Sequence, residues 1–267
     1  MKEEFEVFLR EQELAPNTVR AYLYAVRKFE SDYGEWNRRN LLAFKGELVE
    51  CCKPKTVNLR IQGVNRYLKF LGREKLSLSP VKLQQKNFLE NVISNADYRY
   101  LLSRLKADGQ REWYFVVRYL AATGARIGEL LQLKLEHVQC GYFDLYAKGG
   151  KLRRLYIPEK LREETFSWLK EAGRGGGFLF LNRFGERVTA RGVGKQLKSF
   201  AVRYGIDPRV VYPHSFRHRF AKNFLEKCND IALLADLMGH ESIETTRIYL
   251  RRTSSEQKEI VDRIVTW

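Results

Sequence analysis

Four short segments of the chain carry residue types that could do chemistry together. They read TGARIGEL at 123–130, AKGGKLRRLYIP at 147–158, HSFRHRF at 214–220 and LMGHESIETTRIYL at 237–250. Arginine and lysine offer positive charge to an anion, histidine can carry a proton, and tyrosine can act as a nucleophile or simply pack. Each segment alone is weak evidence, so the interpretation depends on finding all four in one chain.

The segment HSFRHRF suits the start of a phosphate-binding helix. His214 and Arg217 stand three residues apart, so they share one helical face, and Pro213 fits the first helical turn. A helix N-terminus favours a bound phosphate and keeps a histidine neutral, able to accept a proton. His218 has the i, i+4 spacing of a metal pair with His214, but no acidic partner is near. We expect His218 to pack instead, and His137 to be an exposed loop residue.

Tyr249 closes the last segment, where two interpretations are open. Asp230 and Gly239 suit the two ends of a short helix, IALLADLM, and Ser242 suits the start of the next one. His240 then falls in the tight turn between the two helices. Helix, glycine-containing turn and helix is also the pattern of a DNA-binding helix-turn-helix, in which the tyrosine would only pack.

In this order the four segments resemble the tyrosine recombinase family, which includes the lambda-type integrases and the Xer recombinases. The family signature is an Arg, a hairpin Lys, a His-x-x-Arg, a further His or Trp, and a Tyr nine residues after it. His240 and Tyr249 have this spacing. The resemblance covers the whole C-terminal region, and APNTVRAYL near the N-terminus looks like the start of the family's core-binding domain.

The resemblance implies that the tyrosine attacks a DNA phosphate and stays attached as a 3′-phosphotyrosyl link. Negative charge then grows on the five-coordinate phosphorus, and arginine suits it because a guanidinium is always protonated and binds two oxygens at once. The residues that match the family's catalytic set are Arg126, Lys148, His214, Arg217, His240 and Tyr249.

The resemblance also implies separate roles around this set. His214 is expected to take the tyrosine proton, and Lys148, first in the hairpin pattern Lys-Gly-x-Lys-x-Arg, to protonate the leaving 5′-oxygen. Lys151 and Arg153 are then expected to contact phosphate. Glu129 is expected to support the arginines and the histidine by hydrogen bonds; the alternative is an ordinary carboxylate on a helix surface.

No metal ion, nucleotide or other cofactor is expected. The arginines and the lysine supply the charge that a metal would, and the phosphotyrosyl ester keeps the energy of the broken backbone bond for rejoining. The glycine-rich stretch GRGGGFLF lacks the Lys-Ser/Thr ending of a phosphate-binding P-loop, so we expect a turn there.

The predicted function is therefore a site-specific recombinase that exchanges DNA strands through a four-way Holliday junction. Two other classes remain open: a DNA-binding regulator that kept the fold and lost the chemistry, and an enzyme of the type IB topoisomerase kind that only relaxes supercoils. The presence of all six catalytic residue types argues against the regulator.

Composition agrees with a DNA partner. The 267 residues carry a formal net charge of +16, which favours a polyanion, and are 44% hydrophobic, enough for two cores. No apolar run approaches 18 residues and the N-terminus is charged from its second residue, so we expect no signal peptide, no membrane contact and a cytoplasmic, nucleoid-associated protein. The four cysteines form no C-x-x-C pair and are expected to be small apolar fillers in a reducing compartment: Cys51, Cys52, Cys140 and Cys228.

The expected fold is mainly α-helical and has two domains. Residues 1–75 show helical spacing of apolar residues and are predicted to form a helical core-binding domain, which by resemblance is SAM-like. Residues 76–93, with Pro80, are predicted to be a linker. Residues 94–267 are predicted to form an α+β catalytic domain, with a small antiparallel sheet at the hairpin 141–158 and helices on either side.

DNA contacts are expected from both domains. TARGVGKQLKSFAVRYGI is predicted to be a helix capped by Thr189, of the kind that lies in the major groove in this family, and it carries Lys195, Lys198 and Arg203; the alternative is a solvated charged face. In the first domain the candidates are Asn17, Thr18, Arg20, Asn58, Arg60 and Arg66.

The C-terminal tail carries an apolar stripe. Ile260, Val261, Ile264 and Trp267 are spaced for one face of a helix. By resemblance this segment docks on a neighbouring protomer and links four subunits on DNA into a ring, while the free protein could be a monomer. Docking on its own domain is the alternative.

Overall fold

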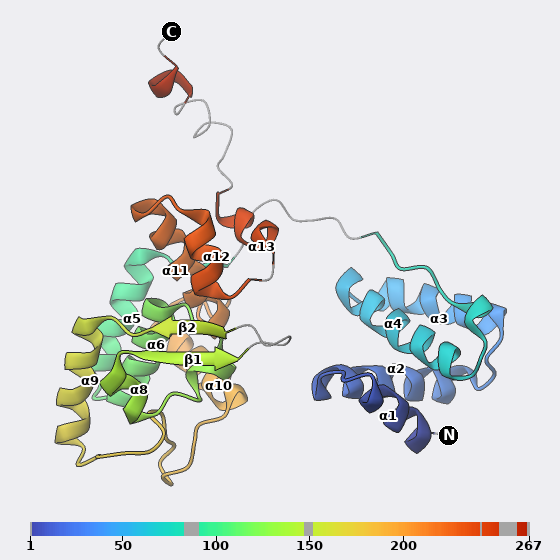
Figure 1. Ribbon diagram of the computed structural model, residues 1–267, viewed down its shortest axis with the longest axis horizontal. Coiled ribbons are helices and arrows are strands. Elements are labelled where there is room, and N and C mark those ends of the chain that lie inside the picture. The colour runs from blue at the N-terminus through green and yellow to red at the C-terminus, as the bar shows by residue number, and fades with distance from the viewer. Residues whose placement is uncertain (1, 83–90, 147–151, 241, 251–260, 266–267) are drawn as a thin grey trace. The chain divides into compact units, whose positions relative to one another are not determined.

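The structure is a computed structural model (Figure 1), and it describes residues 2–82, 91–146, 152–240, 242–250 and 261–265. The chain folds as two compact units, Met1–Gln85 and Lys86–Trp267. Each unit has its own buried apolar core. Among the helices described, we find none with the length and apolar character needed to cross a membrane.

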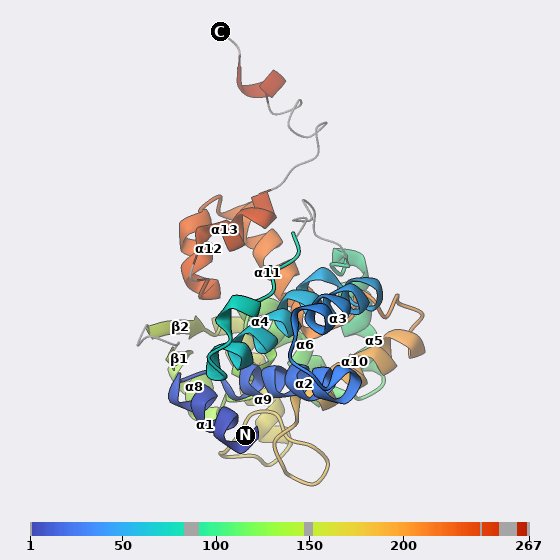
Figure 2. The same ribbon diagram turned by 90° about the vertical axis from the view of Figure 1, so that its right-hand side faces the viewer.

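The first unit is a helical bundle, seen in Figure 2. Its elements are α1 (Lys2–Glu11), α2 (Pro16–Tyr33), α3 (Arg38–Cys51), α4 (Pro54–Phe70) and the 3₁₀ turn η1 (Glu74–Leu76). Proline opens α2 and α4, where its missing N–H leaves no gap in the helical ladder. The two helices pack closely at Gly63, since a Cβ there would lie only 2.9 Å from the Cα of Tyr22. The apolar stripe predicted for α2 is buried.

The second unit is mainly helical with one small sheet. Its elements are α5 (Asn95–Ala107), α6 (Arg111–Thr123), α7 (Ile127–Leu130), α8 (Leu135–Cys140), β1 (Tyr142–Tyr146), β2 (Leu152–Tyr156), α9 (Glu159–Glu171), α10 (Ala190–Arg203), α11 (Pro213–Lys227), α12 (Ile231–Met238), α13 (Ile243–Arg247) and the 3₁₀ turn η2 (Ile248–Leu250). The strands β1 and β2 pair antiparallel, with Tyr142 opposite Tyr156 and Tyr146 opposite Leu152. The predicted mainly α fold with a small antiparallel sheet is confirmed.

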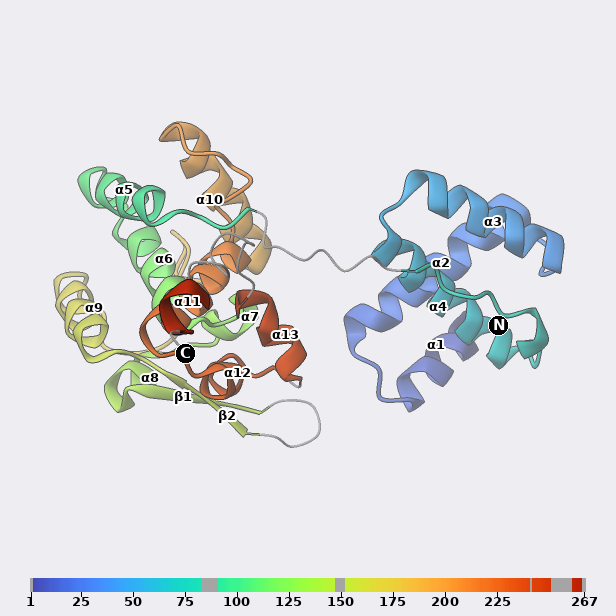
Figure 3. The ribbon, with the colours of Figure 1, turned by 90° about the horizontal axis from the view of Figure 1, so that it is seen from above.

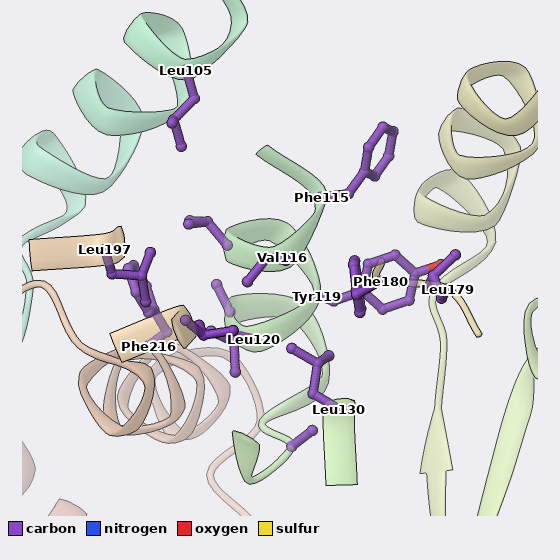
Figure 4. Packing of buried hydrophobic residues seen from close by; sticks show 14 of the residues in the cluster. Leu105, Phe115, Val116, Tyr119, Leu120, Leu130, Leu179, Phe180, Leu197 and Phe216 are labelled. Carbon is purple, nitrogen blue, oxygen red and sulfur yellow. The ribbon is translucent and has the colours of Figure 1, made fainter. Parts of the chain in front are cut away.

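Helix α6 lies at the centre of the second unit's core. Figure 4 shows Val116, Tyr119 and Leu120 of α6 packed among side chains from the surrounding elements, including Phe216 of α11. Because α11 is anchored here through Phe216, the neighbouring residues of its first two turns are held in fixed positions. The other side of α11 meets α12 and η2 (Figure 3), where a smaller apolar cluster includes Tyr249.

The helix ends around this smaller cluster follow the predicted signals. Asp230 caps α12 by accepting from the N–H of Leu233, and Gly239 ends the helix in the left-handed conformation at φ +61°. Ser242 accepts from the N–H of Glu244 at the start of α13. Thr189 caps α10, also as predicted, and Gly124 ends α6 in the left-handed conformation.

The ends of the predicted linker pack against different units. Leu78 is 3% exposed in the core of the first unit, and its backbone N–H donates to Oδ1 of Asn65 over 2.8 Å. Ile93 is 2% exposed in the core of the second unit, and its N–H donates to Oγ of Ser215 on α11 over 2.8 Å. The second contact ties the start of the unit to the helix that carries His214 and Arg217.

Two expectations about packing were wrong. Cys51, Cys140 and Cys228 are exposed and Cys52 is partly exposed, so the cysteines do not fill the core. His137 is also not an exposed loop residue. It lies in α8, where its Nδ1 accepts from the backbone N–H at the helix start and its ring stacks on a phenylalanine.

Candidate active site

Arg217 is buried at the centre of the site, with 1% of its surface exposed. Its Nη1 donates to the carbonyl of Gly124 (2.5 Å), and its Nη2 to the carbonyl of Met238 (2.6 Å) and to Nε2 of His240 (3.0 Å). Burial, together with the positive charges of Arg126 and Arg153, lowers its pKa to about 10. The guanidinium still carries its charge at neutral pH. A permanent cation therefore sits where the ends of α6 and α12 meet α11.

Arg126 and Glu129 lie in the first turn of α7 and bond to each other. The carboxylate of Glu129 accepts from the backbone N–H of Arg126 at 2.7 Å and from its Nη1 at 2.8 Å. Arg126 Nη2 also donates to the carbonyl of Gly239 over 3.1 Å, while nearly half of its side chain stays exposed. Burial raises the pKa of Glu129, but Arg153 and Arg126 outweigh it and hold the pKa below its usual value. Glu129 therefore bonds to Arg126, one of the two arginines that it was expected to support, and to Arg153; among the described residues no hydrogen bond joins it to Arg217 or to a histidine.

Arg153 occupies a different place from the phosphate contact we expected. Its side chain is 7% exposed, and Nη1 donates to Glu129 Oε2 at 2.8 Å while Nε donates to the carbonyl of Leu237 at 2.9 Å. The turn after α12 accommodates it only because residue 239 is glycine, since a Cβ there would lie 2.4 Å from Arg153 Cδ. Arg153 therefore braces strand β2 against the turn that carries His240. Arg153 also lines the same hollow as Arg126 and His240, and its Nη2 has no hydrogen-bond partner among the described residues.

His240 is held by hydrogen bonds on both ring nitrogens. Its Nε2 faces Nη2 of Arg217, which can only donate, so Nε2 accepts and Nδ1 carries the proton. Nδ1 then donates to Oγ1 of Thr246 over 2.7 Å. Burial lowers the pKa of His240 to about 4, and the nearby arginines add to this. The imidazole is therefore neutral and fixed in one tautomer.

Tyr249 brings its hydroxyl to α11. The residue is 8% exposed, and its Oη lies 2.8 Å from Nδ1 of His218. The ring of His214 meets that of His218 edge-on, with the centroids 4.3 Å apart. Burial raises the pKa of Tyr249 to about 12, although Arg217 acts in the opposite direction. The phenol is therefore protonated in the free protein.

This contact corrects the expectation for His218. We predicted that it packs, and the structure places it against the tyrosine oxygen. His214, predicted to take the tyrosine proton, is exposed at the start of α11, and its ring contacts that of His218. The spacing of the two histidines was visible in the sequence, but spacing alone did not show which ring is nearer to Tyr249.

The assembled site is a cationic pocket beside a tyrosine. A hollow of about 840 Å³ lies against Arg126, Glu129, Arg153 and His240, with the strands β1 and β2 and helix α12 forming its other walls. An anion in this pocket would meet guanidinium and imidazole groups with little water between them, which strengthens their attraction. Of the predicted catalytic set, Arg126, His214, Arg217, His240 and Tyr249 come from four separate helices or turns to this one place.

Two predicted residues lie outside the described part of the chain. Lys148 and Lys151 belong to residues 147–151, between β1 and β2. As for metal ligands, the described ranges contain no group of three or more His, Cys, Asp or Glu side chains placed to hold an ion.

Helix α10 presents its predicted basic residues to solvent. Val193, Leu197 and Phe200 are buried on one side of this helix, and the exposed side carries Lys195, Lys198 and Arg203. This arrangement is compatible with a helix that faces phosphates. The same arrangement is expected for a charged helix face that contacts only solvent.

The candidates in the first unit differ in how free their side chains are. Asn58 is fully used within the protein, because its side-chain amide both donates to and accepts from the backbone of Val81. Arg60 donates to the carbonyl of Ala21 and covers the ring of Tyr24 at 3.9 Å. The remaining candidates lie on accessible positions with local partners: Arg20 bonds to Asn17, Arg66 bonds to Gln12, and Thr18 is partly exposed.

Comparison with known proteins agrees with this geometry. The model of the phage integrase family matches residues 91–256. Tyrosine recombinase XerA from Pyrococcus furiosus is 31% identical over 98% of this chain and 92% of its own length, and tyrosine recombinase XerD from Listeria innocua is 29% identical over 94% and 93%.

Solved structures show the same fold. The integrase of transposon Tn1549, in complex with transposon right-end DNA, aligns over 99% of both chains with a TM-score of 0.74 and 17% identity. A crystal structure of XerA recombinase aligns over 100% of this chain and 98% of its own, with a TM-score of 0.56 and 22% identity. The protein belongs to the phage integrase family, and it is a tyrosine recombinase of the Xer type.

Thr246 was not predicted as part of the site, although it precedes Tyr249 by three residues and so shares its side of the chain. It is fully buried, and replacing it with the isosteric valine leaves the Nδ1–H of His240 without an acceptor. We expect Thr246→Val to lower the free energy of unfolding by about 1–3 kcal/mol, the cost of a buried unpaired donor. Urea unfolding measures this.

The neighbouring Thr245 is exposed and serves as the control. Thr245→Val should change the free energy of unfolding by less than about 0.5 kcal/mol, and Thr246→Ser should keep most of the wild-type value because it keeps the hydroxyl. Equal unfolding midpoints for Thr246→Val and Thr245→Val would show that the threonine does not hold His240.

Proposed function

We propose that this protein is a site-specific DNA recombinase that cleaves and rejoins strands through a 3′-phosphotyrosine on Tyr249. The observation that carries the proposal is the position of the Tyr249 hydroxyl. It meets α11 next to the buried cation of Arg217, with Arg126 and His240 on the same pocket. A nucleophile and an anion-binding cluster at one place are what transfer of a phosphoryl ester requires.

The arginines are suited to bind the two non-bridging oxygens of the scissile phosphate. Arg217 now donates to neutral carbonyls and to His240, and a phosphate oxygen is a stronger acceptor for a charged donor. Arg126 is half-exposed and could turn one edge of its guanidinium to the DNA while Glu129 holds the other. His214, which lies near Arg217 and Arg126, is assigned to take the Tyr249 proton, and His240, bonded to Arg217 and Thr246, is assigned to hold Arg217 in place.

Protonation of the leaving 5′-oxygen is assigned to Lys148, with Lys151 as a phosphate contact. The hairpin strands β1 and β2 line the same hollow as Arg126 and His240, including Tyr146 and Leu152 at the ends of the two strands. Rejoining is the reverse attack by a 5′-hydroxyl on the phosphotyrosyl ester. The chemistry therefore calls for no nucleotide, metal or other cofactor.

Binding to duplex DNA is assigned to both units. We assign the core-binding role to 1–75, the linker to 76–93 and the catalytic role to 94–267. The lysines of α10 and the accessible basic residues of the first unit would contact phosphates, which gives affinity without sequence information. The net charge of +16 supports such contacts. Solved relatives include XerH bound to its difH substrate, a DNA complex of the same fold.

A tetramer on DNA is proposed to form through the C-terminal tail. Val261, Ile264 and Val265 are each about half exposed, so this apolar segment has room for a partner surface. A second protomer could provide that surface, and a related structure is titled as a lambda integrase tetramer bound to a Holliday junction. Exchange of the tail would then link neighbouring catalytic units.

The direct test is a nicked suicide duplex, in which the cleaved strand loses a short 5′ piece and cannot be rejoined. Wild-type protein should form a covalent DNA adduct at its own site, visible as a shifted band in denaturing gels. Tyr249→Phe should form none, while Tyr212→Phe, a second tyrosine near the pocket, should form it at close to the wild-type rate.

The same assay separates the rival classes. A regulator without chemistry gives no adduct with wild-type protein, and an enzyme that only relaxes supercoils gives one on almost any sequence. Either result, or an undiminished adduct with Tyr249→Phe, contradicts the proposed function.

The tail is tested by removing residues 254–267. We expect the shortened protein to bind DNA and to cleave the suicide duplex, but to lose the tetrameric complex and strand exchange. Native mass spectrometry of the DNA complexes and a two-site recombination assay measure the two effects. A shortened protein that recombines normally as a tetramer would exclude tail exchange.

A further inference from the structure

Three successive carbonyl groups at the end of α12 each accept a hydrogen bond from a different arginine. The pairs are Leu237 with Nε of Arg153 at 2.9 Å, Met238 with Nη2 of Arg217 at 2.6 Å, and Gly239 with Nη2 of Arg126 at 3.1 Å. The last carbonyls of a helix lack partners within the helix and carry partial negative charge, so they attract cations. Two of these arginines belong to the predicted catalytic set, and Arg153 is the third.

We propose that Arg153 is a positioning residue for DNA cleavage, which holds Glu129 in place so that Arg126 keeps part of its guanidinium free for the scissile phosphate. The inference rests on the proposed function, because it needs Arg126 to bind that phosphate. It gives Arg153 an indirect role, through Glu129 and Arg126, in place of the direct phosphate contact that the hairpin pattern suggested.

The carboxylate of Glu129 is shared between two arginines. Its Oε2 accepts from Nη1 of Arg153 at 2.8 Å and from the backbone N–H of Arg126 at 2.7 Å, and its Oε1 accepts from Nη1 of Arg126 at 2.8 Å. The side chain of Glu129 is 17% exposed and that of Arg153 is 7% exposed. Burial raises the pKa of Glu129, and the charge of Arg153 is the largest of the contributions that lower it below its usual value. Arg153 is therefore the main counter-charge of this carboxylate.

The two arginines differ in exposure, and this difference separates their roles. Arg126 has 48% of its side chain exposed, so DNA could reach it, whereas Arg153 is buried. Without Arg153, Arg126 would be the only cation bonded to Glu129 among the described side chains. A buried carboxylate with one cationic partner is best compensated by a bidentate pair, which would occupy both terminal nitrogens of Arg126. Arg153 removes this demand, so Nη2 of Arg126 stays on the neutral carbonyl of Gly239, which a phosphate oxygen can replace.

The guanidinium of Arg153 suits this role because it bonds in two directions at once. Nη1 donates to Glu129 and Nε donates to the carbonyl of Leu237, which a lysine with its single nitrogen could not reproduce. Nη2 has no hydrogen-bond partner among the described residues, and a buried donor without a partner costs stability. A buried ion pair of this kind is a weak stabiliser, so the position of Arg153 is better explained by its effect on Arg126.

The test is the single-turnover rate of adduct formation on the suicide duplex at saturating DNA. Arg153→Gln removes the charge beside Glu129, so Arg126 is drawn away from the phosphate. The rate should fall by about 100-fold, the loss expected from a displacement of about 1 Å. Arg153→Lys keeps a charge beside Glu129 and should cleave at a rate between those of wild type and Arg153→Gln.

The matched control is Arg118→Gln, which breaks another partly buried arginine–glutamate pair, between α6 and Glu164 of α9 at 3.0 Å. It removes the same unit of charge and should cleave at the wild-type rate. DNA affinity, measured by fluorescence anisotropy, should be equal in the two glutamine variants. Equal cleavage rates in Arg153→Gln and Arg118→Gln would overturn the proposal.

A double-mutant cycle shows whether Arg153 acts through Glu129. Once Glu129→Gln has removed the carboxylate, adding Arg153→Gln should slow cleavage little further, whereas independent contributions would multiply. The double variant contains neither buried charge, so it keeps the test possible if Arg153→Gln alone fails to fold. Losses that multiply would contradict the proposal.

A DNA substrate with a 5′-thio leaving group separates this role from one in protonating the leaving group. A thiolate leaves without a proton, so this substrate should not restore cleavage by Arg153→Gln. A restored rate would place the effect of Arg153 on the general acid, and the proposal would be wrong. An undiminished adduct with Tyr249→Phe would instead refute the proposed function itself.

Discussion

The burial of one guanidinium, that of Arg217, organises the catalytic unit. A buried cation is costly unless its donors are paired, and here Nη1 and Nη2 are paired with two backbone carbonyls at helix ends and one imidazole, while Nε has no partner among the described residues. The carbonyls belong to the last turns of α6 and α12, which are 114 residues apart in sequence, from Gly124 to Met238. Arg217 therefore requires these two helix ends to meet at α11, and the glycines that follow them in the left-handed conformation make that meeting possible.

The site that results has two sides with different chemistry. On one side Arg126 and His240 line a hollow that could take a phosphate, Glu129 and Arg153 brace its walls, and Arg217 is buried against His240. On the other side are groups that handle protons: His218 and Tyr249 share a hydrogen bond, and burial, with a smaller contribution from the nearby positive charges, lowers the pKa of His214 and His218. Cations that bind the phosphate and neutral histidines that can accept the tyrosine proton can therefore lie close together in one site.

The sequence predicted much of this because local signals and the global fold agree. The caps at Asp230, Thr189 and Ser242 and the terminating glycines set helix ends correctly. Helix α3 was not identified separately within residues 1–75, although Leu41, Phe44 and Leu48 have helical spacing and Asn37 is a good cap, because its exposed face also carries apolar residues. The family pattern located the catalytic residues in the sequence, and the structure brings the described ones together.

What the sequence could not predict depends on distances between elements far apart in the chain. Arg153 reads as one more basic residue in a hairpin, and only the approach of α12 makes it a buried brace. His218 reads as a packing residue until η2 brings a hydroxyl to it. The exposure of the cysteines could not be predicted for the same reason. Composition gives the general tendency of a residue type to be buried, and not the burial of a particular residue.

The central claim is that this pocket directs one reaction, the attack of Tyr249 on a DNA phosphate. The most direct measurement is to trap the adduct on a suicide duplex, digest it with nuclease and protease, and locate the remaining nucleotide by tandem mass spectrometry. The account predicts a single modified peptide, with the phosphate ester on Tyr249. A nucleotide attached to any other residue would contradict it.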